Sequence, residues 1–182
     1  MKVTSSFKKG SLLLFGILTI CGSCKQSIKK GVPVDAVTNM ENEQKQLIDA
    51  MQTFGSNYAA AWSGGDPAAV AAYFAPDGSL KVNDSEAAVG RDAITNVAKG
   101  FMDAFPDLVV TMDSLVKQPD GLEFHWTLTG TYAGPEGAGN NVRISGFEVW
   151  QLNAKGLVQS SIGSFDKADY DRQLNGQTGV GR

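Results

Sequence analysis

The chain has 182 residues, a length that suits one domain with an appendage. Its 42% hydrophobic and 19% charged residues are typical of a folded protein and exclude an intrinsically disordered one. Residues 1–23 hold three lysines and no acid, which leaves 13 basic against 19 acidic residues in the rest of the chain. A domain with this negative balance lacks the basic surface that nucleic-acid binding needs, so we exclude that class of function.

The N-terminus carries a predicted export signal. Lys8 and Lys9 precede an apolar run over residues 11–20. A basic segment followed by about ten apolar residues is typical of a signal peptide, and it is too short to cross a bilayer as a helix. The run ends in Gly22-Ser23-Cys24, which resembles the lipobox of bacterial lipoproteins. That resemblance implies cleavage before Cys24 and acylation of this cysteine.

The N-terminal pattern also predicts domain organisation and location. We expect a lipoprotein signal peptide over residues 1–23, a tether over 24–36, a folded domain over 37–175 and a disordered tail over 176–182. The mature protein is then a lipoprotein anchored to a membrane of the bacterial cell envelope, facing the periplasm or the exterior. Cleavage before Cys21 and a plain secretory signal both remain open. The chain has two cysteines, Cys21 and Cys24, so the mature domain offers no disulfide and no thiol nucleophile.

Apolar residues at spacings of three and four predict three helices, over residues 35–62, 68–74 and 91–105. Gly64 and Gly65 end the first helix, and Asp66-Pro67 provides an N-cap and a first helical residue for the second. We expect the apolar stripe of the first helix to cover a sheet. It comprises Val37, Met40, Leu47, Ile48, Met51, Phe54, Tyr58 and Trp62.

Strands dominate the C-terminal half. We expect a turn over residues 75–78, strands over 79–82 and 108–116, three consecutive strands between 121 and 166, and a last short helix over 167–174. In the first of the three, Leu122, Phe124, Trp126 and Leu128 alternate with polar residues, which predicts one face on a core. This order of elements predicts an α+β fold in which a curved antiparallel sheet, wrapped by three helices, encloses a cone-shaped pocket.

Several short segments, in this order and spacing, resemble a SnoaL-like domain of the nuclear-transport-factor-2-like superfamily, a cystatin-like α+β roll. They are residues 61–67, 73–78, 90–94, 105–108, 126–131, 165–166 and 172–174. The resemblance implies an apolar pocket inside the sheet and homodimerisation through the outer sheet face. The superfamily includes polyketide cyclases, ketosteroid isomerases, dehydratases and epoxide hydrolases, and also members that only bind or associate.

Asp166 is the first candidate catalytic residue. It follows the last predicted strand, and in family members that act as cyclases an aspartate of this kind removes a proton next to a carbonyl. A carboxylate in an apolar pocket has a raised pKa, which makes it a better base near neutral pH. Asp166 could equally cap the helix that begins at Lys167. Many SnoaL-like members carry a Glu-His pair in the closing strand, where this chain has Ser160-Ser161, so an acid/base partner is missing.

Glu148 is the second candidate catalytic residue. Its neighbours at a spacing of two are Gly146 and Trp150, which places the carboxyl on an apolar face. A buried carboxyl without a partner is costly. It therefore has Arg143, a tyrosine or a hydroxyl group nearby, or acts as an acid in the pocket; an ordinary ion pair across the sheet, with Arg143 or a lysine, is the simplest of these arrangements.

His125 is the single histidine of the chain. It shares a strand face with Glu123 and threonines, opposite Phe124 and Trp126, so we expect it to be structural or to lie at the dimer interface. One histidine without cysteines in the domain offers no metal site and no Ser-His-Asp triad. We expect neither a metal nor a cofactor.

The remaining site candidates are aromatic side chains where helices and sheet would meet. Most should form the core, and a subset could line a pocket for a small hydrophobic molecule. Tyr73 is the candidate that would bring a hydroxyl group into the pocket. The predicted pocket residues are Tyr73, Phe101, Phe105, Trp126, Trp150 and Ser164.

Two functions follow from these patterns. The first is a lipid-anchored protein whose apolar pocket binds a small hydrophobic molecule without strong catalysis, as the envelope location and the missing acid/base partner favour. The second is a cofactor-free cyclase, isomerase or hydrolase in which Asp166 is the general base, assisted by Glu148 or Tyr73. The two are distinguished by whether Asp166 and Glu148 face one cavity.

Overall fold

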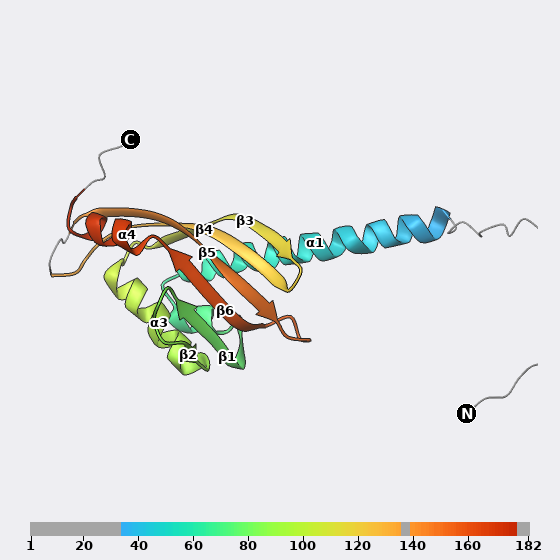
Figure 1. Ribbon diagram of the computed structural model, residues 1–182, viewed down its shortest axis with the longest axis horizontal. Helices are drawn as coiled ribbons and strands as arrows, with labels where there is room; N and C mark the ends of the chain where they lie inside the picture. The colour runs from blue at the N-terminus through green and yellow to red at the C-terminus, as the bar shows by residue number, and fades with distance from the viewer. Residues whose placement is uncertain (1–33, 136–138, 178–182) are drawn as a thin grey trace, which may run out of the picture.

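The computed structural model describes residues 34–135 and 139–177, and within them one six-stranded sheet with the order β2-β1-β6-β5-β4-β3 (Figure 1). The helices are α1 (Val34–Ser63), α2 (Pro67–Ala71), α3 (Arg91–Ala104) and α4 (Lys167–Leu174). The strands are β1 (Phe74–Val82), β2 (Ala88–Val89), β3 (Val109–Gln118), β4 (Gly121–Thr131), β5 (Asn141–Leu152) and β6 (Val158–Phe165). The predicted signal peptide and Cys24 lie outside the described residues.

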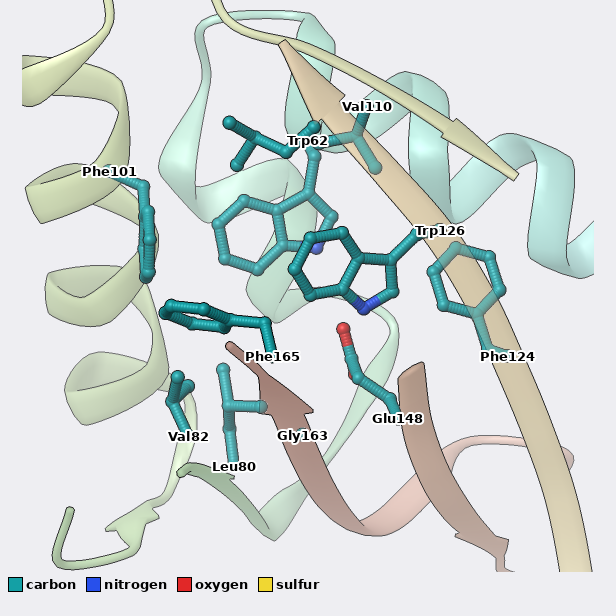
Figure 2. A pocket seen from close by; sticks show the side chains of 11 residues that line it. Trp62, Leu80, Val82, Phe101, Val110, Phe124, Trp126, Glu148, Gly163 and Phe165 are labelled. Carbon is teal, nitrogen blue, oxygen red and sulfur yellow. The ribbon is translucent and has the colours of Figure 1, made fainter. Parts of the chain in front are cut away.

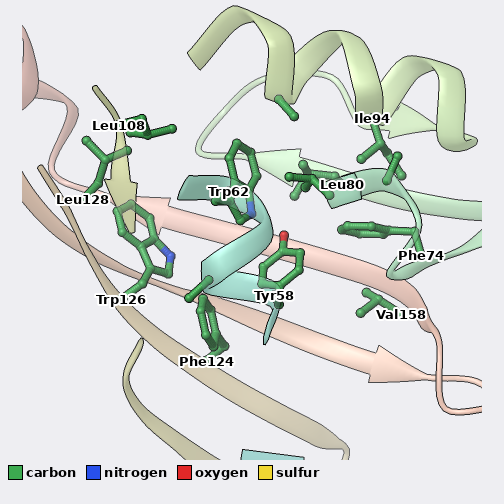
Figure 3. Close-up of a cluster of buried hydrophobic side chains, with 14 of the residues drawn as sticks. Tyr58, Trp62, Phe74, Leu80, Ile94, Leu108, Phe124, Trp126, Leu128 and Val158 are labelled. Atoms are coloured by element: carbon green, nitrogen blue, oxygen red, sulfur yellow. The ribbon is translucent and has the colours of Figure 1, made fainter. Parts of the chain in front are cut away.

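The sheet is mixed only where its first and last long strands meet. Strands β3, β4, β5 and β6 pair antiparallel in chain order, and β6 pairs parallel with β1. The C-terminal half of α1 packs against β3, and α3 packs against α2 and β1. These helices cover one face of the curved, unclosed sheet, as the α+β prediction requires, and the core fills the space between (Figure 3).

The alternation in β4 is confirmed. Leu122, Phe124 and Leu128 are buried, whereas Glu123 and His125 lie on the opposite face and are partly exposed. Polar and apolar side chains alternate because successive residues of a strand point to opposite faces of the sheet. The face that carries Phe124 and Leu128 therefore lines the interior.

The start of β1 differs from the prediction. A helix was expected through Phe74 and a turn over residues 75–78, but α2 ends at Ala71 and β1 begins at Phe74. The pairing of β1 with β6 shifts register between Phe74 and Ser79. Pro76 and Gly78 therefore lie in an irregular part of the strand, where the ladder does not require every backbone N–H. The two-residue strand β2 lies in a segment that was predicted to be a loop.

The N-terminal half of α1 also differs from the prediction. Residues 37–50 are all exposed, and Met40 and Leu47 keep 65% and 55% of their surface. This half of α1 projects beyond the sheet (Figure 1). The apolar stripe of this half therefore does not cover the sheet. The helix begins at Val34, inside the segment predicted to be a tether. In the described part of the chain, no helix combines the length and apolarity needed to cross a membrane.

Candidate functional site

A small cavity lies between the inner face of the sheet and the helices (Figure 2). Its walls are apolar except for the carboxyl group of Glu148 and the indole N–H groups of Trp62 and Trp126. It is lined by Trp62, Leu80, Val82, Phe101, Val110, Phe124, Trp126, Leu128, Glu148, Gly163 and Phe165. Its volume is about 40 Å³, and since one water needs about 10–15 Å³ of such space, it has room for a small chemical group.

The cavity adjoins a wider surface hollow of about 850 Å³ between α3, β1, β6 and α4. The residues common to both linings are Leu80, Val82, Phe101, Gly163 and Phe165. The outer hollow adds the more polar Asn83, Ser164 and Lys167 near its rim. A molecule in the outer hollow could therefore extend a small group past Phe101 and Phe165 into the inner cavity.

Glu148 is the buried carboxyl group of the cavity. It lies on β5, and 7% of its surface is exposed because its side chain shares the inner face with Ile144 and Trp150. Three neutral donors surround it. The hydroxyl of Ser161 donates to Oε2 at 2.6 Å, the indole Nε1 of Trp150 at 2.8 Å and the hydroxyl of Tyr58 at 3.2 Å.

The two oxygens of Glu148 are not equivalent. Oε2 accepts all three of these hydrogen bonds, whereas Oε1 has one long contact, 3.4 Å from the Tyr58 hydroxyl. None of the ion pairs between described residues includes Glu148. The neutral donors therefore bind mainly Oε2, whereas Oε1 can still form further hydrogen bonds.

Burial raises the pKa of Glu148 above the ordinary 4.5, although the hydrogen bonds from Ser161, Trp150 and Tyr58 act in the opposite direction. Burial is the larger influence because a low-dielectric environment disfavours the charged form, and no cation compensates for it. Burial likewise raises the pKa of Tyr58 well above 10.0, and the charge of Glu148 adds to this effect. Tyr58 is thus a neutral hydrogen-bond donor at physiological pH.

Trp126 also brings a polar group to the cavity. Its side chain comes from β4, and its indole Nε1 is buried without a hydrogen-bond partner among the described residues. The ring lies against the backbone at Gly146, where an added Cβ would come within 2.6 Å of Trp126 Cζ2. Glycine at position 146 therefore leaves room for the indole ring.

The structure brings together some of the predicted site residues. Glu148, Phe101 and Trp126 line the cavity, and Trp150 lies behind it as a donor to Glu148. Three other candidates lie elsewhere. Tyr73 packs edge-on against Phe54 and Tyr58, Phe105 is fully buried and lines a separate hollow beside Pro106, and Ser164 lines the outer hollow.

Asp166 does not face the cavity with Glu148. Its side chain is exposed and accepts a hydrogen bond from the backbone N–H of Asp169 at 2.9 Å, which makes it the N-cap of α4. The expectation that it points into the pocket fails because the inward residues of β6 are Ser161, Gly163 and Phe165. Asp166 therefore has the capping role that the sequence also allowed.

Two residues that contact Glu148 were not identified from the sequence. Tyr58 was assigned to the apolar stripe of α1 without regard to its hydroxyl, and Ser161 was treated as the loss of an acid/base partner. Both donate to Glu148. The sequence called for a tyrosine or a hydroxyl group near Glu148, because a buried carboxyl must be hydrogen-bonded, but it did not show that Tyr58 and Ser161 are these residues.

The structure also shows what lies near Glu148 and His125. Arg143 is exposed on β5 and does not pair with Glu148. His125 Nε2 lies 2.7 Å from Glu123 Oε1 on the outer face of the sheet. Within residues 34–135 and 139–177, no group of three or more His, Cys, Asp or Glu side chains could hold a metal ion.

Comparisons with known proteins agree with this architecture. The family model described as SnoaL-like polyketide cyclase matches residues 52–174, whereas none of the curated proteins is a match. The fold is similar to that of TsrD from Streptomyces laurentii, with 21% identity, a TM-score of 0.61 and coverage of 71% of this chain and 97% of that chain.

Two further crystal structures are similar. A putative SnoaL-like polyketide cyclase from Jannaschia sp. CCS1 has 17% identity and a TM-score of 0.56, with coverage of 68% of this chain and 92% of that chain. A hypothetical protein with a ketosteroid isomerase-like fold from Catenulispora acidiphila, in complex with trimethylamine, has 19% identity and a TM-score of 0.53, with coverage of 60% and 82%. At these identities the likeness establishes the fold.

Proposed function

This chain belongs to the SnoaL-like polyketide cyclase family, and from that premise we propose that it binds a small, largely apolar molecule in the cavity around Glu148. The observation that carries the proposal is an apolar cavity with one buried carboxyl group, which shares lining residues with a wider surface hollow. Ligand sites are commonly concave and apolar, with a few polar groups that fix the orientation of the ligand. The body of the ligand would lie in the outer hollow, and a smaller group would reach the inner cavity.

Methylenecyclohexane is a suitable probe for this proposal because it is compact and purely apolar. We expect it to raise the melting temperature and to shift the NMR signals of residues that line the cavity. Gly163→Leu should abolish both effects, since Gly163 lines both the cavity and the outer hollow and a Cβ there makes only ordinary contacts.

Gly100→Leu is the matched control. It introduces the same side chain on α3, where an added Cβ meets nothing within 4 Å. This variant should bind methylenecyclohexane like the wild type. Absence of binding to the wild type, or equal binding to the Gly163→Leu variant, would refute the proposal.

Acid–base catalysis is the second candidate function. A buried carboxyl with a raised pKa that faces a cavity favours it, because such a group exchanges a proton closer to neutral pH. The general base would then be Glu148 and not Asp166, which is exposed at the N-terminus of α4. Turnover of an enolisable ketone that is lost in Glu148→Gln and kept in Asp166→Asn would support this function, and the reverse pattern would contradict it.

The envelope location remains part of the proposal. The support is the basic and apolar N-terminus that ends in Gly22-Ser23-Cys24. Metabolic labelling with a radioactive fatty acid should mark the wild-type protein and leave Cys24→Ala unlabelled. Label retained by Cys24→Ala and lost by Cys21→Ala would assign the acylation to the other cysteine.

Homodimerisation through the outer sheet face is also proposed. The support is the exposed apolar side chains on the described strands, among them Phe147 and Ile162, which are 37% and 55% exposed. Sedimentation should give a dimer for the wild type and a monomer for Phe147→Glu combined with Ile162→Lys. A wild-type monomer would contradict this arrangement.

A further inference from the structure

The projecting half of α1, residues 37–50, carries an apolar stripe that the folded domain leaves exposed (Figure 1). Its members keep between 41% and 65% of their surface, and they are Val37, Met40, Leu47 and Ile48. A helical segment of 14 residues without packing is only marginally stable in water. The stripe therefore indicates a partner that covers it.

The spacing of the stripe is that of a coiled coil. With Val37 as position a of a heptad, Met40 and Leu47 both fall at position d. Gln44 and Met51 fall at the next two a positions, and Met51 packs against the core of the domain. Residues at a and d that recur every seven residues form the seam between two coiled helices. The projecting half of α1 thus offers a seam of two heptads, and the domain begins where that seam ends.

The charges of this segment fit a second helix better than a membrane surface. Residues 37–50 hold three acidic side chains and one lysine. A helix that lies on a bilayer needs a polar face rich in lysine and arginine, because the lipid surface is anionic. Lys45 and Asp49 form an ion pair at 2.8 Å, at positions b and f, away from the seam.

The flanking positions favour a parallel pair of identical helices. Glu43 lies at position g, and in a parallel pair it would face Ile48 at position e of a second copy. The two copies of Glu43 are then not opposite one another. Gln44 is the one polar residue in the seam, and a single polar residue at an a position fixes the register and the number of helices in such a coil.

The proposed lipid anchor would orient two copies in the same direction. Residues 25–33 separate Cys24 from Val34, the first residue of α1. Nine residues reach at most about 35 Å, so α1 would begin close to the bilayer in every copy. Anchoring to one membrane also raises the effective concentration of the partner. A seam of only two heptads needs this help, since short helices pair weakly.

We propose that residues 37–51 of α1 form a parallel, two-stranded coiled coil with the same residues of a second copy of this chain in the same membrane. This inference rests on the proposed lipid anchor and does not depend on the ligand pocket. The pairing surface is also separate from the outer sheet face, because α1 packs on the inner side of the sheet against β3. In dilute solution the same helices stay apart.

Cysteine cross-linking in isolated membranes tests this pairing, since an acylated Cys24 has no free thiol. In the full-length chain, Met40→Cys and Leu47→Cys should each give a disulfide-linked dimer on oxidation with copper phenanthroline, because d residues of a parallel pair face each other. Asn42→Cys and Asp49→Cys are the matched controls. They are equally exposed and one heptad apart, but they lie at position f and should give far less dimer.

Disruption of the seam provides the second readout. Leu47→Asp, placed in the Met40→Cys chain, introduces a charge into the seam and should lower the cross-linked fraction by about tenfold, which corresponds to roughly 1.4 kcal/mol. Gln46→Asp introduces the same charge at position c and should leave the cross-linked fraction unchanged. Phe147→Glu combined with Ile162→Lys should also leave it unchanged, because these residues lie on the outer sheet face.

The outcomes separate the coiled coil from the lipid anchor. Equal cross-linking from the d and f positions, or cross-linking that Leu47→Asp does not reduce, would overturn the coiled coil. Cysteines at d that link only to other proteins, or that are shielded from a water-soluble maleimide without forming a dimer, would overturn it in favour of another protein or the lipid surface. Fatty-acid labelling without a dimer would overturn the coiled coil alone, and absence of labelling would overturn the anchor as well.

Discussion

At the scale of single residues, the position of Glu148 depends on a balance between burial and hydrogen bonding. Burial removes water from its carboxyl group, and three neutral donors from α1, β5 and β6 replace part of that solvation. The donors are not enough to offset burial, so the pKa of Glu148 remains raised. The folded protein therefore favours the protonated form of Glu148 more than the unfolded chain does.

Stability should depend on pH through this residue. The pKa of Glu148 is higher in the folded than in the unfolded protein, so the folded state binds more protons and its stability falls as pH rises above about 4.5. Glu148→Gln keeps an oxygen that accepts from Ser161 and Trp150 and cannot ionise. Urea unfolding over a series of pH values should show the variant gaining stability relative to the wild type as pH rises through the raised pKa.

The quantity to compare is the difference in unfolding free energy between the wild type and Glu148→Gln, because other carboxyl groups titrate in the same pH range. For example, hydrogen bonds from Thr131 lower the pKa of Asp107 in both proteins. A difference in unfolding free energy that does not change between pH 4 and pH 8 would contradict the predicted role of Glu148.

At the scale of secondary-structure elements, the strands that bury one face were predicted from the sequence more accurately than the other elements. The alternation from Leu122 to Leu128 placed β4 correctly because every second residue enters the same core. Residues 75–78 were misassigned because proline and glycine are typical of turns, whereas here they occupy an irregular part of β1. Only the flanking residues Phe74 and Ser79 pair with β6, which is distant in sequence.

The candidate site was predicted only in part, and one-sided burial of strands was again the informative pattern. Alternation placed Glu148 and Trp126 on inner faces, which the structure bears out. The sequence did not show toward which face of the sheet Asp166 points, because both faces of β6 carry small residues. In addition, the pairings of β6 with β1 and with β5 each contain a register shift. The donors Tyr58 and Ser161 come from elements that are 90 and 13 residues away from Glu148 in the chain. Spacing alone does not show such contacts.

The helix cap at Asp166 leads to a prediction at this scale. Its carboxylate accepts from the backbone N–H of Asp169 at the start of α4, so Asp166→Ala should lower the unfolding free energy by about 1 kcal/mol. Asp166→Asn, which retains a capping oxygen, should lose much less. Both variants should bind methylenecyclohexane with wild-type affinity. Chemical denaturation measures the two stabilities, and the binding assay measures the two affinities. A loss of binding in both variants would show that Asp166 is part of the ligand site.

At the scale of the whole molecule, the folded domain and the first half of α1 contribute differently to stability. Residues 37–50 are exposed, whereas Tyr58 and Trp62 on the same helix are buried in the core. Burial of apolar surface is the dominant stabilising contribution to folding. The projecting half of the helix therefore adds little to the stability of the domain.

Truncation tests this division. A chain that begins at Leu47 should keep its unfolding free energy within about 0.5 kcal/mol, as surface changes usually do, and should bind methylenecyclohexane unchanged. A chain that begins at Ala59 lacks the buried Tyr58 and should be strongly destabilised. Thermal denaturation measures both, and a large loss in the shorter deletion would show that the projecting half is packed in solution.

The most direct test of the proposed cavity is a ¹³C NMR titration of the Glu148 carboxyl, assigned with Glu148→Gln, with and without saturating methylenecyclohexane. We predict a titration midpoint above the ordinary 4.5 in the free protein. We predict a further rise with methylenecyclohexane, because an apolar ligand in the cavity disfavours the charged form of the carboxyl group. A midpoint at or below 4.5, or one that methylenecyclohexane leaves unchanged or lowers, would contradict the proposed cavity.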